Sequence, residues 1–172
     1  TASLLVELLT EELPPKSLRV LGEAFAEQLV VEIVRHRLKE RDPSKQVFAT
    51  PRRLAVLVQD VRAQGLDSEH EGPASSNSRA IEGFAKNHNV APGALERRQT
   101  SKGEIVFAHR PGVRLAAVLP GILDKIIKKL PVSKVMRWGD GEVQFVRPVH
   151  GVVMMHGKRV IPGTVLGIPA SN

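Results

Sequence analysis

The sequence contains no cysteine and no tyrosine, and it has only five phenylalanines and one tryptophan in 172 residues. The lack of cysteine excludes disulfides and thiolate metal ligands, which fits a reducing compartment. Aromatic residues make up 3% of the chain, so few rings remain for stacking on bases once a core is built. Any contact with RNA is therefore expected to involve phosphates and shape.

Long apolar runs and targeting signals are also missing. The longest nearly uninterrupted apolar segments, residues 54–58 and 152–155, are much too short to span a bilayer. The pattern of a secretory signal, a charged start followed by an apolar stretch and a small-residue cleavage site, is not seen in this sequence. The composition, 42% hydrophobic and 25% charged, is typical of a globular domain. It predicts a cytoplasmic protein without membrane contact.

Positive charge is in excess. Lysine and arginine number 25 against 18 acidic residues, which gives a net charge of +7 and a pI near 10.1. Such a balance favours a polyanionic partner, because binding phosphates releases condensed counterions. The alternative is a surface that only promotes solubility. Basic residues gather at 35–45 and 125–137, and acidic residues at 7–12 and 67–71.

Two apolar stripes with helical spacing predict helices over about residues 16–40 and 115–130. The first stripe includes Leu21, Phe25 and Leu29 at steps of four. Pro120 falls inside the second stripe, so that helix either kinks there or begins its regular part there.

Short apolar segments predict strands at the following positions: residues 3–9, 47–50, 54–61, 104–109 and 143–146. Residues 149–155 and 160–166 are expected to pair as a C-terminal hairpin, whereas the polar residues 67–78 indicate a surface loop. The irregular mixture predicts an α+β fold with a mixed, largely antiparallel sheet. We expect one domain, 1–172, with a small helical insertion at about 79–100.

Motifs for chemistry are absent from the sequence. It has no GxxxxGK[ST] and no GxGxxG phosphate loop. The six histidines form no close ligand pair on a helix, so no metal site and no cofactor are expected in this chain. Glu11 and Glu12 are the most acid–base-like pair. They could act on a substrate, cap the following helix or pair with an arginine.

Two basic motifs attract attention. FATPRRLAV, residues 48–56, places Arg52 and Arg53 beside a proline bend, and residues 136–151 carry Arg137 and Arg147 among glycines. The planar guanidinium suits phosphates and carboxylates equally. These arginines are therefore candidates for RNA or interface contacts, or for ion pairs within the chain. The structural ion-pair candidates on the acidic side are Glu11, Glu12 and Asp140. Lys125, Lys128 and Lys129 add a basic face to the second helix.

Several segments in order resemble one family. They are LLVELLTEELPP, FATPRRLAVLV, AIEGFAKNH, LPVSKVMRWGDGEVQFVRPVHG and VIPGTVLGI. Together they are similar to the N-terminal region of the beta subunit of the bacterial heterotetrameric glycyl-tRNA synthetase. The resemblance covers nearly the whole chain. This sequence has Leu8–Leu9 where the first motif usually has Ile-Gly, and its loops around residues 75–78 and 110–114 are shorter than expected.

The resemblance implies a role without a complete active site. In this family two alpha and two beta subunits form the enzyme, and the alpha subunit holds the ATP, magnesium and glycine sites. The beta subunit binds tRNA(Gly). The leading hypothesis is therefore a non-catalytic module that contacts tRNA, the alpha subunit, or both. The alternatives are an editing-like hydrolase using Glu11, Glu12 and His150, and a purely architectural domain.

Overall fold

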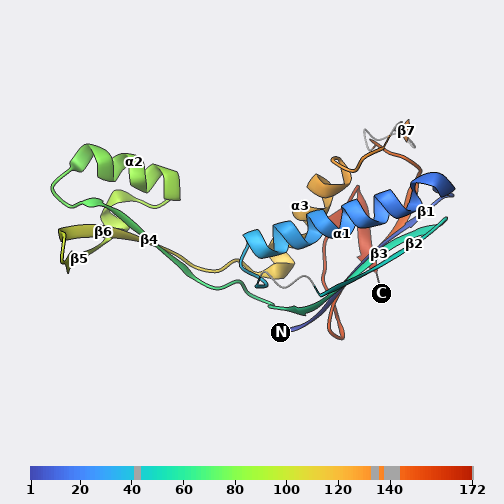
Figure 1. Cartoon of the computed structure of the whole chain (residues 1–172), viewed down its shortest axis with the longest axis horizontal. Coiled ribbons are helices and arrows are strands. Elements are labelled where there is room, and N and C mark those ends of the chain that lie inside the picture. Colours follow the sequence, from blue (N-terminus) through green and yellow to red (C-terminus); the bar gives the residue numbers. More distant parts are fainter. Residues whose placement is uncertain (41–43, 133–135, 138–143, 172) are drawn as a thin grey trace. The chain divides into compact units, whose positions relative to one another are not determined.

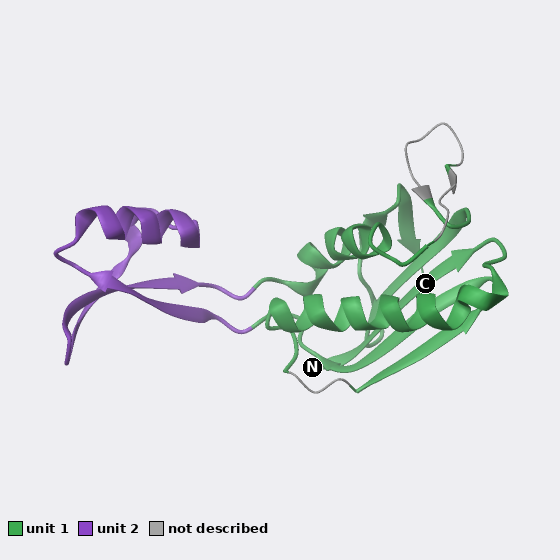
Figure 2. Ribbon diagram, turned by 45° about the horizontal axis from the view of Figure 1, so that its top comes forward, with its two compact units in different colours: residues 1–65, 113–172 green, residues 66–112 purple. Residues whose placement is uncertain are grey.

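The computed structural model describes residues 1–40, 44–132, 136–137 and 144–171. The chain folds into two compact units, which Figure 2 distinguishes by colour. Unit 1 comprises Thr1–Gly65 and Val113–Asn172, and unit 2 comprises Leu66–Gly112. Unit 2 is thus an insertion between two parts of unit 1, and it carries its own hydrophobic core.

Unit 1 is built on a seven-stranded sheet with the order β11-β12-β9-β1-β3-β2, in which β10 also pairs with β9. Its strands are β1 Ala2–Thr10, β2 Lys45–Thr50, β3 Arg53–Val61, β9 Val149–His156, β10 Arg159–Val160, β11 Thr164–Val165 and β12 Ile168–Ser171. Only the pairing of β12 with β9 is parallel. The predicted α+β fold with a mixed, largely antiparallel sheet is confirmed.

Two helices cover one face of this sheet, as Figure 1 shows. They are α1, Leu18–Arg35, which follows the short 3-10 turn η1, Pro15–Ser17, and α3, Leu115–Ile127. The alternate residues Leu4, Val6 and Leu8 of β1 point toward the helices and are fully buried. They join Phe25 of α1 and Leu119 of α3 in one hydrophobic core, as the period-two and helical patterns require.

The first helix, predicted over about residues 16–40, is confirmed, and it ends at Arg35, a few residues before the expected end. It ends because Arg37 adopts the left-handed conformation, with φ at 56°. The amide of Leu38 then donates to the carbonyl of Ile33 at 3.0 Å, and the amide of Arg37 donates to that of Val34 at 2.9 Å. This is a Schellman ending. The buried side chain of Leu38 seals it against the core.

The second helix and the C-terminal hairpin also differ in length from the prediction. Helix α3 runs from Leu115 through Pro120 to Ile127, three residues short of the expected end. The hairpin around Gly157 exists, but its return strand β10 has two residues rather than the seven of 160–166. Pro162 cannot donate a ladder hydrogen bond. The chain then forms a second small hairpin, in which β11 pairs with β12.

Unit 2 packs one helix on a three-stranded antiparallel sheet with the order β4-β6-β5. Its elements are β4 Ser68–Ala74, α2 Ser78–His88, the 3-10 turn η2 Pro92–Ala94, β5 Glu96–Thr100 and β6 Gly103–Arg110. Helix α2 is capped by Asn77, whose side chain accepts from the amide of Ala80 at 3.1 Å. The prediction of a loop over residues 67–78 was wrong, because β4 lies there.

A further short pair of strands, β7 Met136–Arg137 and β8 Gln144–Phe145, belongs to unit 1.

An ion pair joins α1 to α3 across unit 1. The Nζ of Lys125 lies 2.6 Å from a carboxylate oxygen of Glu32, whose side chain is 13% exposed. This hydrogen bond is the main cause that lowers the pKa of Glu32, with smaller contributions from Arg35 and His36. A carboxylate with a lowered folded-state pKa stabilises the fold above its unfolded pKa, and that contribution is lost as the pH falls.

We therefore expect Glu32→Gln to change how stability depends on acid. At neutral pH the variant should unfold about 1 kcal/mol more easily, the size of a partly exposed charge-assisted bond. Between about pH 5 and pH 3 the wild type should lose this advantage. Urea unfolding followed by circular dichroism at a series of pH values measures both curves. A difference that stays constant down to pH 3 would contradict the assignment to Glu32.

Candidate functional site: a groove at the end of strand β1

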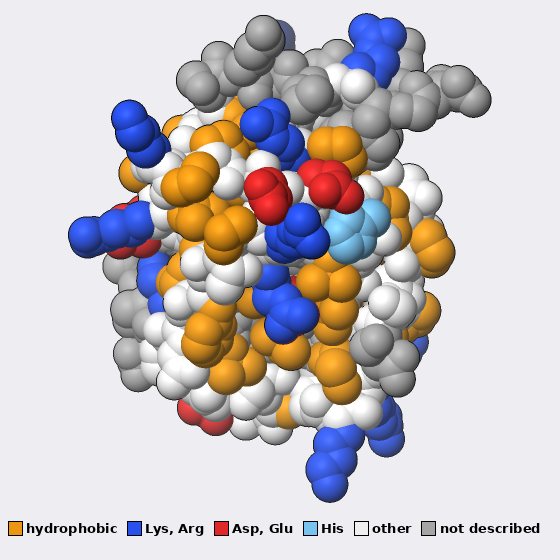
Figure 3. Space-filling view, turned by 90° about the vertical axis from the view of Figure 1, so that its right-hand side faces the viewer, with side chains coloured by type: hydrophobic (Ala, Val, Ile, Leu, Met, Phe, Trp, Pro, Cys, Tyr) orange, Lys and Arg blue, Asp and Glu red, His pale blue; other side chains and the backbone are white. Residues whose placement is uncertain are grey.

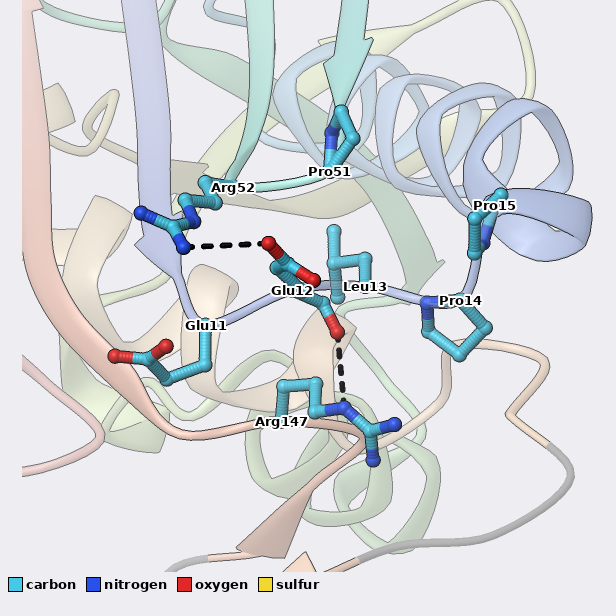
Figure 4. Close-up of a pocket in the computed structure, with 8 residues that line it drawn as sticks. All are labelled: Glu11, Glu12, Leu13, Pro14, Pro15, Pro51, Arg52 and Arg147. Carbon is cyan, nitrogen blue, oxygen red and sulfur yellow. Dashed lines mark hydrogen bonds and ion pairs between the residues drawn. The ribbon is translucent and has the colours of Figure 1, made fainter.

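A groove of about 700 Å³ lies where β1 ends, and Figure 4 shows its lining. The lining residues are Glu11, Glu12, Leu13, Pro14, Pro15, Pro51, Arg52 and Arg147. The three prolines supply apolar surface, the buried Leu13 lies beneath them, and two carboxylates and two guanidinium groups supply charge. Figure 3 shows this end of the molecule, where acidic and basic side chains gather among hydrophobic ones.

Backbone hydrogen bonds fix the segment that follows β1. The amide of Thr10 donates to the carbonyl of Arg52 at 3.0 Å, and the amide of Leu13 donates to that of Pro51 at 2.6 Å. On the other side, the amide of Glu11 donates to the carbonyl of Pro148 at 2.9 Å. The segment is therefore held between the β2–β3 turn and the approach to β9, and the buried Leu13 anchors it in the core.

The two arginines of the groove are engaged with this same segment. The Nη2 of Arg52 lies 3.2 Å from a carboxylate oxygen of Glu12. The Nε of Arg147 donates to the backbone carbonyl of Glu12 at 2.9 Å, and its Nη1 donates to the carbonyl of Val146 at 3.3 Å. Figure 4 shows both guanidinium groups reaching toward Glu12 from opposite sides. These contacts connect the segment after β1 with the β2–β3 turn and with the segment before β9.

The groove offers little for acid–base chemistry. The carboxylate of Glu12 is bound to Arg52, whereas that of exposed Glu11 has no partner among the described residues. His150 is exposed on β9. Among residues 1–40, 44–132, 136–137 and 144–171, no three His, Asp or Glu side chains are grouped so that they could hold a metal ion. No helix in this described part is long and apolar enough to cross a membrane.

The other candidate cations do not line the groove. Arg53 projects from the sheet face opposite the helices, and its Nη1 is 3.8 Å from Glu7. Lys125 is bound to Glu32. Lys128 and Lys129, just after α3, are exposed, as is Arg137 on β7. Asp140 lies outside the described residues. The structure thus brings Glu11, Glu12, Arg52 and Arg147 together and separates the rest.

Sequence reasoning missed a charged network in unit 2. Arg98 on β5 binds Glu69 at 2.9 Å and Glu96 at 2.6 Å, and it lies 4.7 Å above the ring centre of Phe107. Hydrogen bonds from Arg98 and then His109 lower the pKa of Glu96 to about 2. The local signal is a run of three charged residues, Glu96, Arg97 and Arg98. The further partner of Arg98, Glu69, lies in the segment that was predicted to be a loop.

The excess positive charge belongs to unit 1. Unit 2 contains six lysines and arginines and six acidic residues, so its formal charge is zero. The net charge of +7 is therefore carried by the remaining residues. A polyanion would be attracted mainly to unit 1.

Comparisons with known proteins agree on one family. Its sequence model, described as glycyl-tRNA synthetase beta subunit, matches residues 4–172. The glycine–tRNA ligase beta subunit of Serratia proteamaculans (strain 568) is 44% identical over 98% of this chain and 26% of its own length. That of Yersinia pestis (strain Pestoides F) is 44% identical over 95% of this chain and 25% of its own length. The chain spans about a quarter of the length of these relatives.

Proposed function

Since this chain belongs to the glycyl-tRNA synthetase beta-subunit family, we propose that it supports the ATP-dependent charging of tRNA(Gly) without performing the chemistry itself. Its contribution is contact with tRNA phosphates and with the alpha subunit of an alpha2beta2 enzyme in the cytoplasm. ATP and magnesium bind at the alpha subunit. The observation that carries the tRNA contact is the concentration of positive charge in unit 1, with cations that remain available at its surface.

Lys128 and Lys129 are the best placed of these cations. Both follow α3, both are exposed, and no described carboxylate pairs with either. Lys125, in contrast, is already bound to Glu32 on α1. Exposed lysines add to a phosphate-attracting field without a desolvation cost. Arg137 on β7 is exposed as well and extends the same set of candidates.

An architectural role suits the groove better. Arg52 and Arg147 bind Glu12 and backbone carbonyls of the loops around it. Their guanidinium groups therefore hold the end of β1 in place, and a phosphate would have to compete with these contacts. The groove then presents a fixed shape lined by Pro14, Pro15 and Pro51, which suits contact with the alpha subunit more than contact with RNA.

The tRNA contact predicts a specific salt effect. In the assembled enzyme, the double variant Lys128→Ala, Lys129→Ala should bind tRNA(Gly) about 3–10-fold more weakly, and the log–log dependence of affinity on salt should flatten by about one unit per lost phosphate contact. Filter binding or fluorescence anisotropy across a salt series measures both quantities.

The matched control is the double variant Arg79→Ala, Lys86→Ala. Both residues are exposed on α2 of unit 2, which has no net charge, and this variant removes the same charge from the chain. It should leave the affinity and the slope unchanged. An equal loss in both double variants would indicate a general charge effect, and no loss in either would exclude these lysines as tRNA contacts.

A further inference from the structure

The main sheet of unit 1 has a second face, and that face is largely apolar. Between the strands, Leu5 pairs with Leu57 on one side and with Met155 on the other. One row along, Glu7 lies between Val153 and Ala55, and Ala55 pairs with Phe48 on the edge strand β2. We call these side chains, with Leu9, the open face.

No described element of unit 1 covers the open face. Helices α1 and α3 both pack on the opposite side, against the core that contains Leu4, Val6 and Leu8, as Figure 1 shows. Leu5, Leu9, Leu57 and Met155 do not take part in that core, and each is half-buried by its neighbours in the sheet. The side chain of Phe48 is 49% exposed.

A sheet face that meets only water normally carries alternating polar residues. Here the two middle rows of strands β9, β1 and β3 carry leucine, valine, methionine and alanine, with Glu7 as the one charged residue among them. Ala55 and Val153 are only 2% and 8% exposed, so Leu5, Leu57 and Met155 form most of the accessible apolar surface. Polar residues follow toward the strand ends, where Ser3 donates a hydrogen bond to Gln59 and Arg53 pairs with Leu9. A contiguous apolar patch of this kind marks a contact surface. The two charges on it face each other: Glu7 is 17% exposed and lies 3.8 Å from the guanidinium group of Arg53, whose side chain is 52% exposed. One half-exposed arginine beside a carboxylate offers RNA phosphates little to bind.

We propose that, in a beta subunit of the length of the relatives, the open face is the permanent docking surface for an apolar helix face from another part of the same polypeptide. The apolar stripe is three strands wide, which is about 10 Å, and an α-helix with its side chains has a similar diameter. This proposal rests on the family assignment and is independent of the tRNA contact.

The length of the relatives favours a segment of the same polypeptide as the element that covers the open face. About three quarters of their polypeptide lies outside the matched region, and a covalently linked segment reaches the face at a high effective concentration. A largely apolar surface fits a contact that is never released better than a transient one. The alpha subunit and a second copy of the chain remain as the outcomes to be distinguished.

Two neighbouring methionines provide the test. Met155 lies on the open face, whereas Met154 is 0% exposed in the core. In a full-length beta subunit carrying this region, without alpha subunit, peroxide should oxidise Met155 as slowly as Met154, as read by mass spectrometry. If the face is uncovered, Met155 should react about tenfold faster, because oxidation of methionine follows its exposure. That result would overturn the proposal.

Dilution and subunit addition identify the occupant. Protection of Met155 that persists on dilution supports a segment of the same polypeptide. If the protection of Met155 is lost on dilution, the face belongs to a second copy of the chain. If Met155 is protected only when alpha subunit is added, the face belongs to that subunit. Either result overturns the proposal. Leu57→Glu should then expose Met155 but not Met154, whereas Gln46→Glu, in the same row on the edge strand, should not. The salt dependence of tRNA binding is unaffected by these outcomes.

Discussion

Phe25→Ala is expected to lower the free energy of unfolding of unit 1 by about 3–5 kcal/mol, the usual cost of truncating a buried aromatic side chain. Phe25 lies in the middle of α1, is 0% exposed and is among the largest fully buried side chains of the chain. Its removal leaves a cavity between the helix and the sheet that the close-packed core cannot fill.

The same helix supplies a control for Phe25→Ala. Val31 of α1 is 58% exposed, so Val31→Ala should change stability by no more than about 0.5 kcal/mol. Urea unfolding of both variants, followed by the fluorescence or circular dichroism of the folded chain, gives the two free energies. Equal effects would mean that α1 does not pack on the sheet through Phe25. A large loss should also weaken tRNA binding, because Lys128 and Lys129 depend on the same core for their position.

The apolar pattern was sufficient to predict both helices and the main strands of unit 1, but not the order of the strands in the sheet. The spacing of Leu21, Phe25 and Leu29 indicates the buried side of α1, and all three are fully buried. The strands around Pro51 were predicted for the same reason, since hydrophobic burial is encoded locally as a period of two or 3.6. These elements lie at β2 and β3 with nearly the expected bounds.

Elements fixed by long-range contacts were not predictable. Strand β4 has the polar sequence SEHEGPA, and its composition indicates a loop. It is a strand because it pairs with β6 and because Glu69 binds Arg98, 29 residues further along the chain. The end of α1 was missed for a related reason. Arginine is an uncommon residue at a left-handed helix ending, and only the burial of Leu38 after it explains the turn.

In the candidate site, too, the sequence predicted which residues are involved but not their long-range contacts. Sequence identified Glu12, Arg52 and Arg147 as charged residues beside turns, but it could not decide between phosphates and internal partners, because a guanidinium group suits both. Arg52 and Glu12 are 40 residues apart and meet only through the folding of β1 against β3. Lys125 was expected to project freely with Lys128 and Lys129, yet its contact with Glu32 spans 93 residues. Only a tertiary structure distinguishes an engaged cation from an available one.

Gly22→Leu is expected to destabilise unit 1 by about 1–3 kcal/mol, the cost of overpacking a well-filled interior. Gly22 is buried on the side of α1 that faces β2. A Cβ atom at this position would lie 3.0 Å from Cγ1 of Val47 and 3.1 Å from Cβ of Ala49. The larger leucine side chain has no space there, so α1 must move away from the edge of the sheet.

Gly22→Ala separates the packing cost from the helix propensity. Alanine favours the helix by about 1 kcal/mol over glycine, and this gain opposes the tight contact of a single methyl group with Val47. The alanine variant should therefore unfold within about 1 kcal/mol of the wild type, whereas leucine should be clearly worse. Urea unfolding of both variants makes the comparison. If leucine were tolerated as well as alanine, α1 would not lie against β2 at this distance. The position of Glu32, which binds Lys125 from the same helix, would then also differ.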